Sequence, residues 1–118
     1  MNINVLGTKY KIETHKISED ETLKKNHWCG YSSEEAKEIV VADVSEDEYF
    51  PDMTDHERYL YKNKMLRHEI MHAFLNESGL ADSALTYNCA WVKNEEMIDW
   101  FAIQSPKIYK VFEEIGCI

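Results

Sequence analysis

The chain has 118 residues and a mass of 13.9 kDa, a length typical of one domain, so we expect a single domain spanning residues 1–118. Its 13 Lys and Arg are outnumbered by 22 Asp and Glu, and the net charge of −9 argues against nucleic acid as a partner, because phosphate binding requires a surplus of basic residues. No apolar run, such as residues 39–42, is longer than four residues, which is far shorter than the ~20 residues of a membrane span. Residues 1–4 do not resemble a signal peptide, so we expect a cytoplasmic protein without membrane contact.

The first half of the chain is predicted to form strands. Residues 3–12 indicate two strands joined near Gly7, because Tyr10 and Ile12 alternate with lysines as in a half-buried strand. Residues 18–21 have the composition of a helix start, with Ser18 as its cap. Residues 37–42 are β-branched at their centre, which favours a third strand. The acidic residues 45–55 are expected to form an exposed connection.

The second half is predicted to be helical. Residues 54–76 contain no Pro or Gly, which predicts one long helix that stops near Gly79. Residues 94–104 indicate another helix, and Ser105-Pro106 is typical of the start of a last helix, which would end at Gly116. Because strands precede helices, we expect an α+β fold in which a small N-terminal β-sheet packs on a helical half.

The longest predicted helix contains the motif HExxH, as His68-Glu69-Ile70-Met71-His72. Residues four apart in a helix lie about 40° apart around its axis, so both imidazoles leave the same face and can bind one cation. Glu69 lies about 100° from His68, close to the metal but poorly placed to ligate it. It can therefore hold a water molecule that the metal has acidified.

A catalytic zinc site has three protein ligands and one open position, so we expect a third ligand from an element that faces this helix. Glu95 and Asp99, on the next strongly predicted helix, are spaced i, i+4 and share one face. One of them can ligate the metal while the other accepts a hydrogen bond from a ligand imidazole. Glu96 and Glu77 are the alternative ligands, although Glu77 fits better as part of the helix end.

The motif HExxH followed on a later helix by N-E-x-x-x-D resembles the gluzincin metallopeptidases. Residues 95–102, which read EEMIDWFA, are more similar to the small bacterial and phage proteins of the ImmA/IrrE type, which carry E-x-x-A-N-x-F-A after their HExxH. Ile98 and Asp99 stand where that family has Ala-Asn. The resemblance covers about residues 66–107 and implies a zincin-like fold, a Zn²⁺ cofactor and the hydrolysis of a protein or peptide substrate.

By this resemblance, His68 and His72 match the zinc-binding histidines, Glu69 the general base and Glu95 the third ligand. Asp99 matches the partner that hydrogen-bonds a ligand imidazole. The implied mechanism is metal-assisted amide hydrolysis, in which the metal acidifies a water molecule and Glu69 passes its proton to the leaving amine.

Gluzincin sites also use a Tyr or His side chain to stabilise the oxyanion. Tyr87, eight residues before Glu95, is a candidate for this catalytic role, as are His27 and Tyr31, and the sequence does not choose among them. Cys29, Cys89 and Cys117 lack a CxxC spacing, so we expect reduced thiols, although Cys29 or Cys89 could approach the metal.

Two other functions fit the sequence. One is a non-catalytic zinc-binding regulatory or interaction protein of phage or mobile-element origin, and the other is a helical interaction domain without metal. Glu69 favours the peptidase, because a structural metal site does not need a carboxylate one residue after its first ligand. The oligomeric state and the identity of the substrate are left open by the sequence.

Overall fold

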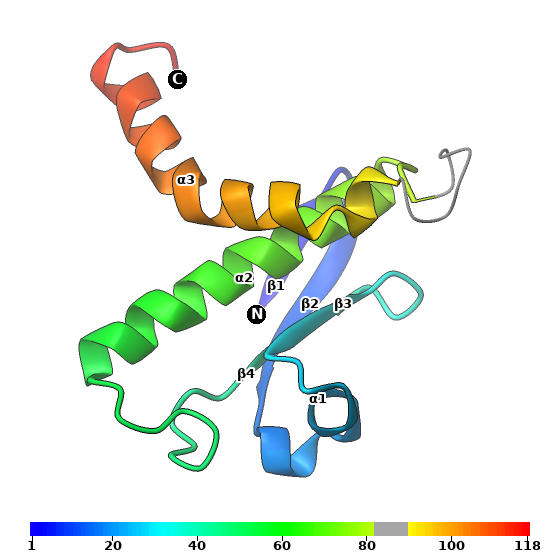
Figure 1. Cartoon of the computed structure of the whole chain (residues 1–118). Coiled ribbons are helices and arrows are strands. Elements are labelled where there is room, and N and C mark those ends of the chain that lie inside the picture. The colour runs from blue at the N-terminus through cyan, green and yellow to red at the C-terminus, as the bar shows by residue number, and fades with distance from the viewer. Residues whose placement is uncertain (82–89) are drawn as a thin grey trace.

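The computed structural model describes residues 1–81 and 90–118 of the chain (Figure 1). Within these residues, one sheet is formed by β1 (Asn2–Val5), β2 (Thr8–His15), β3 (Gly30–Ser33) and β4 (Glu38–Ala42). The strand order is β1-β2-β4-β3; β1 is antiparallel to β2, β2 is parallel to β4, and β3 is antiparallel to β4. β3 is therefore an edge strand of a mixed sheet.

The described helices are α1 (Glu21–Asn26), α2 (Asp55–Glu77) and α3 (Glu95–Glu114), with the short 3-10 helices η1 (Ile17–Glu19) and η3 (Trp91–Lys93) before α1 and α3. In Figure 1, α2 crosses one face of the sheet, and α3 lies against α2 on the side away from the sheet. The α+β class is therefore confirmed. None of the described helices is long and apolar enough to cross a membrane.

Three groups of buried side chains join these layers. The group between the sheet and α2 consists of Val5, Tyr10, Ile12, Ile39 and Ala73. The group on the other side of the sheet consists of Ile17, Leu23, Val40, Ala42 and Phe50. The group between α2 and the start of α3 consists of Leu75, Ala90, Val92 and Ile98. α2 is thus packed on two sides, and its middle is held at a fixed distance from both the sheet and α3.

The apolar run in β4 follows from its position in the sheet. Ile39 packs toward α2, whereas Val40 and Ala42 pack toward α1 on the opposite face. A strand that is covered on both faces does not alternate between apolar and polar residues.

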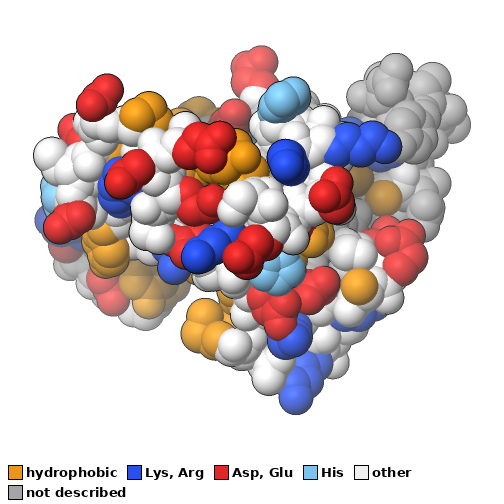
Figure 2. Space-filling model, turned by 90° about the horizontal axis from the view of Figure 1, so that it is seen from below, with side chains coloured by type: hydrophobic (Ala, Val, Ile, Leu, Met, Phe, Trp, Pro, Cys, Tyr) orange, Lys and Arg blue, Asp and Glu red, His pale blue; other side chains and the backbone are white. Residues whose placement is uncertain are grey.

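The molecular surface carries charges of both signs. On the face shown in Figure 2, acidic side chains are spread among basic ones.

The start of α2 is fixed by a capping box. The Thr54 hydroxyl accepts a hydrogen bond from the Glu57 N–H at 3.1 Å, and the Glu57 carboxylate accepts one from the Thr54 N–H at 2.7 Å. Such caps contribute about 1 kcal/mol each. The predicted long helix over residues 54–76 is confirmed to within a residue at each end.

The predicted break at Ser105-Pro106 is wrong, because α3 continues through Pro106 to Glu114. Proline has no N–H, so the carbonyl of Ala102, four residues earlier, loses its helical partner. Arg67 of α2 replaces that partner, since its Nε donates to the Ala102 oxygen at 2.6 Å. Figure 1 shows α3 changing direction near its middle, as expected where a proline interrupts the helical hydrogen bonds.

Three smaller features differ from what the sequence led us to expect. The strand β3 was not predicted, because Gly30-Tyr31-Ser32-Ser33 is short and carries few strand-forming residues. The cap of α1 is Asp20 rather than Ser18, and its carboxylate accepts from the Leu23 N–H at 3.0 Å. The connection at residues 45–55 is largely exposed, but Phe50 within it is buried in the core.

The C-terminal end of α2 is tied to the sheet by Glu77. Its carboxylate accepts hydrogen bonds from the Thr8 hydroxyl at 2.8 Å and the Tyr10 hydroxyl at 2.7 Å, and it forms an ion pair with Lys37. Lys37, followed by the two hydroxyls, lowers the pKa of Glu77 from 4.5 to about 2. Glu77 is therefore an anchor of the helix, as its position at the helix end suggested, and not part of the motif.

Replacing Glu77 with Gln is expected to lower the unfolding temperature at neutral pH, because the ion pair with Lys37 is lost. The folded pKa lies below the unfolded value, so this stabilisation is complete above about pH 4.5 and is lost as the pH falls toward about 2. Thermal unfolding of both proteins between neutral and acid pH should show the difference shrink over that interval. The exposed Glu113→Gln variant is the control, and a constant difference at all pH values would contradict this role of Glu77.

Candidate metal centre

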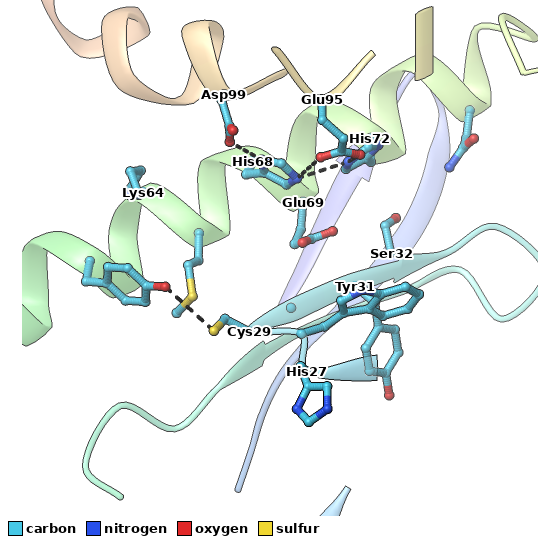
Figure 3. A pocket seen from close by; sticks show the side chains of 15 residues that line it. His27, Cys29, Tyr31, Ser32, Lys64, His68, Glu69, His72, Glu95 and Asp99 are labelled. Carbon is cyan, nitrogen blue, oxygen red and sulfur yellow. Dashed lines mark hydrogen bonds and ion pairs between the residues drawn. The ribbon is translucent and has the colours of Figure 1, made fainter. Parts of the chain in front are cut away.

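The two helices bring the predicted site residues together. His68, Glu69 and His72 lie in the middle of α2, and Glu95 and Asp99 lie in the first two turns of α3. Packing of Ile98 against the α2 side of the core turns the face of α3 that carries Glu95 and Asp99 toward the histidines. Figure 3 shows these side chains around one cavity of about 660 Å³ between α2, α3 and β3.

Three donor groups converge on one point. The Nε2 atoms of His68 and His72 are 3.1 Å apart, and the Glu95 carboxylate oxygens lie 3.1 Å from the first and 3.2 Å from the second. Around a tetrahedral ion with ligands at 2.0–2.1 Å, neighbouring ligand atoms are about 3.3 Å apart. The observed spacing is therefore close to that of three ligands of one small cation.

Each imidazole is oriented by a second partner. Nδ1 of His68 lies 2.9 Å from Oδ1 of Asp99, and His72 has a hydrogen bond with the backbone of Val92. An imidazole that donates through one ring nitrogen presents a lone pair on the other. Burial, aided by the proximity of His68, also lowers the pKa of His72 and favours the neutral form that can bind a metal.

Glu69 lies beside these donors on the sheet side of α2. It is 7% exposed, and among the described residues it is the only charged residue that is buried. Burial, together with the nearby charge of Glu95, raises the pKa of its carboxyl group to about 8. The donor atoms of His68, Glu69 and His72 all lie within 4.8 Å of one another, so this group is positioned to bind a metal ion.

Two carboxylates thus lie near the histidines, and their positions differ. Glu95 is largely exposed and places its oxygens at hydrogen-bond distance from both Nε2 atoms. Glu69 is buried and has no hydrogen bond to either imidazole among the described contacts. Glu95 therefore has the position of a ligand, and Glu69 that of a group beside the ligand sphere.

Gly30 on β3 makes room for Glu69. A Cβ atom at residue 30 would lie 3.0 Å from both Cγ and Oε1 of Glu69, and 3.1 Å from the carbonyl oxygen of Val40. Sequence reasoning did not identify this residue. The available signal was a glycine within a short polar strand, which often marks a close approach of another chain segment.

Ser32, two residues further along β3, also lines the cavity and was not identified from the sequence. Among the buried side-chain nitrogen and oxygen atoms of the described residues, the Ser32 Oγ is the only one without a hydrogen-bond partner. Buried hydroxyls are normally paired, and an unpaired one at a cavity suggests a partner that binds there. Figure 3 shows Ser32 on the same side of β3 as Glu69.

The other candidates do not join this centre. Tyr87 and Cys89 lie outside the described residues. His27 and Tyr31 line the cavity, but Figure 3 shows both pointing away from Glu69, and the Tyr31 hydroxyl donates to Asp20 at 3.1 Å. Tyr31 faces away from α2 because adjacent strand residues face opposite sides, and a role at the oxyanion stays a prediction for His27 and Tyr31.

The cysteines are free where they are described. Cys29 and Cys117 form no disulfide, and the sulfur of Cys29 contacts the Tyr61 hydroxyl at 3.6 Å. Cys29 lines the cavity but does not belong to the group of donor atoms around His68 and His72.

No protein-family model, no curated protein and no solved structure matches the chain. The resemblance to gluzincins and to ImmA/IrrE-type proteins therefore stays a prediction. The geometry of the donor atoms is the observation from which function can be argued.

The contact between Gly30 and Glu69 can be tested by a double-mutant cycle. Gly30→Ala is expected to destabilise the fold by about 1–3 kcal/mol, because the added methyl group overpacks the interior. In a Glu69→Ala background the methyl group has more room, so the same change should cost less, with a coupling of at least about 0.5 kcal/mol. Urea unfolding of the four proteins gives these values. An equal cost in both backgrounds would show that Glu69 is not the constrained neighbour.

Proposed function

We propose that the protein is a zinc-dependent metallopeptidase of the gluzincin type that hydrolyses peptide bonds. His68, His72 and Glu95 are the metal ligands, and Glu69 is the general base. The observation that carries the proposal is the convergence of two imidazole nitrogens and one carboxylate at 3.1–3.2 Å, with a second, buried carboxylate beside them.

The chemistry of the donor set supports zinc. Two His and one Glu form a ligand set of catalytic zinc sites, which keep a fourth position open, whereas structural zinc sites are closed by four protein ligands. Two His and one carboxylate also occur at non-haem iron sites. The presence of both histidines and Glu69 on one helix as HExxH favours zinc and hydrolysis.

Bound zinc would acidify a water molecule and polarise the scissile carbonyl. Glu69 is placed to take a proton from that water and to give it to the leaving amine. With its pKa raised to about 8 by burial, the Glu69 carboxyl group is mostly protonated at neutral pH. The charge of a bound cation would lower that pKa and favour the carboxylate, which is the form that can act as a base. Asp99 and the backbone of Val92 hold the imidazoles in orientation throughout.

The edge strand β3 supports a peptide as the substrate. It lines the cavity, and among the described strands one of its sides has no neighbouring strand. An extended peptide can add to such an edge through main-chain hydrogen bonds. A peptide in this position would pass beside Glu69 and next to the unpaired Ser32 hydroxyl, which can donate a hydrogen bond to a substrate carbonyl.

Zinc binding should depend on the proposed ligands in a graded way. Titration calorimetry with Zn²⁺ is expected to show loss of binding for His72→Ala and strong weakening for Glu95→Gln. Asp99→Asn should weaken binding about 10- to 100-fold, because Asp99 only orients His68. Glu96→Gln, an exposed neighbour of Glu95, is the matched control and should bind like the wild type. Unchanged affinity in Glu95→Gln would remove Glu95 from the ligand set.

Hydrolysis should depend on Glu69 without zinc binding being lost. Glu69→Gln is expected to keep its zinc and to cleave at least about 100-fold more slowly, since proton transfer by a positioned base contributes that much. Cleavage of a peptide library from a digested proteome, read by mass spectrometry, provides the measurement. Wild-type protein that binds zinc but cleaves no peptide would instead favour the non-catalytic zinc-binding protein.

Ser32→Ala is expected to reduce kcat by about tenfold or more with little change in KM or zinc affinity, if its hydroxyl bonds a group that gains charge during the reaction. Ser33→Ala, on the same strand but with its side chain facing the other way, is the control. Equal rates for both variants would exclude this role for Ser32.

A further inference from the structure

Within residues 1–81 and 90–118, no segment covers the C-terminal half of α3. The first half of the helix contributes Ile98 and Ala102 to the core, whereas every residue from 109 to 118 is exposed. The change of direction near Pro106 carries this half away from α2, and Figure 1 shows it projecting from the body of the molecule. We define residues 106–118 as the arm.

The arm exposes more large apolar side chains than a helix that faces only solvent normally does. Its exposed apolar residues are Tyr109, Val111, Phe112, Ile115 and Ile118, with exposed fractions of 42–70%. Clusters of exposed large apolar side chains usually mark an interaction site.

The dimensions of the molecule agree with a missing partner. The radius of gyration is 15.4 Å, whereas a compact chain of this length has about 13.5 Å. The accessible surface is 7956 Å², against about 6,700 Å² for a folded monomer of this mass. The projecting arm contributes to this excess, because every residue from 109 to 118 is exposed.

The apolar residues follow the spacing of a helix–helix seam. Phe101, Ile108 and Ile115 are seven residues apart, and Gln104 and Val111 occupy the intermediate positions at steps of three and four. Within the arm, Ile108, Val111 and the C-cap residue Ile115 keep the a/d spacing of a coiled coil over one heptad, whereas Phe101 and Gln104 precede the bend at Pro106. A helix face of this kind fits another helix.

The charges on the rim select a second copy of the same chain. Lys107 and Glu114 are one heptad apart and lie on the same flank of the seam. In an antiparallel pair centred between residues 109 and 110, Lys107 of each copy lies beside Glu114 of the other, and Ile108 packs beside Val111 of the other copy. In a parallel pair, Lys107 would instead face Phe112, and no opposite charges would meet.

We propose that the arm is a homodimerisation element that pairs antiparallel with the arm of a second copy. An anionic membrane surface fits less well, because its amphipathic helices carry a surplus of basic residues. Here Lys107 and Lys110 are balanced by Glu113 and Glu114. The inference is independent of the proposed peptidase activity, since the arm contains none of the metal-centre residues.

Sedimentation equilibrium of the full chain tests the proposal. The wild type is expected to show twice the chain mass of 13.9 kDa, and Val111→Glu combined with Ile115→Glu should show the monomer mass. Both side chains are exposed, so circular dichroism should show an unchanged fold. Tyr59→Glu, an equally exposed apolar residue on α2, is the control and should remain dimeric. A monomeric wild type, or a dimer that survives both arm substitutions, would overturn the proposal.

The antiparallel orientation has its own test. Lys107→Glu and Glu114→Lys should each weaken the dimer by about tenfold, because each places like charges together twice across the pair. The double exchange restores both ion pairs and should return the dissociation constant to that of the wild type. If the double variant is as weak as the single ones, the antiparallel pairing of these two residues is wrong.

Discussion

The packing of α3 against α2 is the contact on which the candidate metal centre depends, because its donor atoms come from both helices. Ile98, Val92 and Leu75 form the apolar part of this contact, and the Arg67 side chain adds a hydrogen bond to the Ala102 carbonyl. Without that contact, Glu95 and Asp99 would be ordinary exposed carboxylates in the first turns of a helix. With that contact, Glu95 and Asp99 lie beside His68 and His72 of the HExxH motif.

The other side of α2 constrains the chemistry rather than the binding. The sheet removes Glu69 from water, and the missing side chain at Gly30 allows the carboxylate to fit against the strand. The same helix therefore turns its imidazoles toward α3 and the carboxyl group of Glu69 toward β3, and all three side chains line one cavity. This difference in burial underlies the roles proposed for these groups, with the imidazoles as metal ligands and Glu69 as the general base.

Much of this arrangement could be predicted from the sequence, because it depends on local spacing. His68 and His72 share a face of one helix, Glu95 and Asp99 share a face of another, and helical geometry alone brings each pair together. The roles assigned to these residues stay predictions. The sequence carried only a weak local signal for Gly30, because its importance arises from a contact with Glu69 across about forty residues of chain. Ser32 could not be predicted, since the burial of its hydroxyl depends on the packed cavity. The continuity of α3 through Pro106 was missed for the same reason: its compensating donor, Arg67, lies on another helix.

The contacts of Glu77 restrain the position of α2 and therefore also the position of the candidate metal centre, although Glu77 is not part of that centre. Glu77 follows His72 by five residues, about 7.5 Å along the helix axis, and it binds groups on β2 and on the turn before β4. At the other end of α2, the Arg58 guanidinium binds the carbonyl oxygens of Val44 and Phe50. A helix held at both ends cannot easily roll about its own axis, and rolling is the motion that would carry the two imidazoles away from Glu95. If the centre binds a cation as proposed, its affinity would depend partly on lysine, tyrosine and arginine side chains that do not contact the cation, because they hold the whole helix in place.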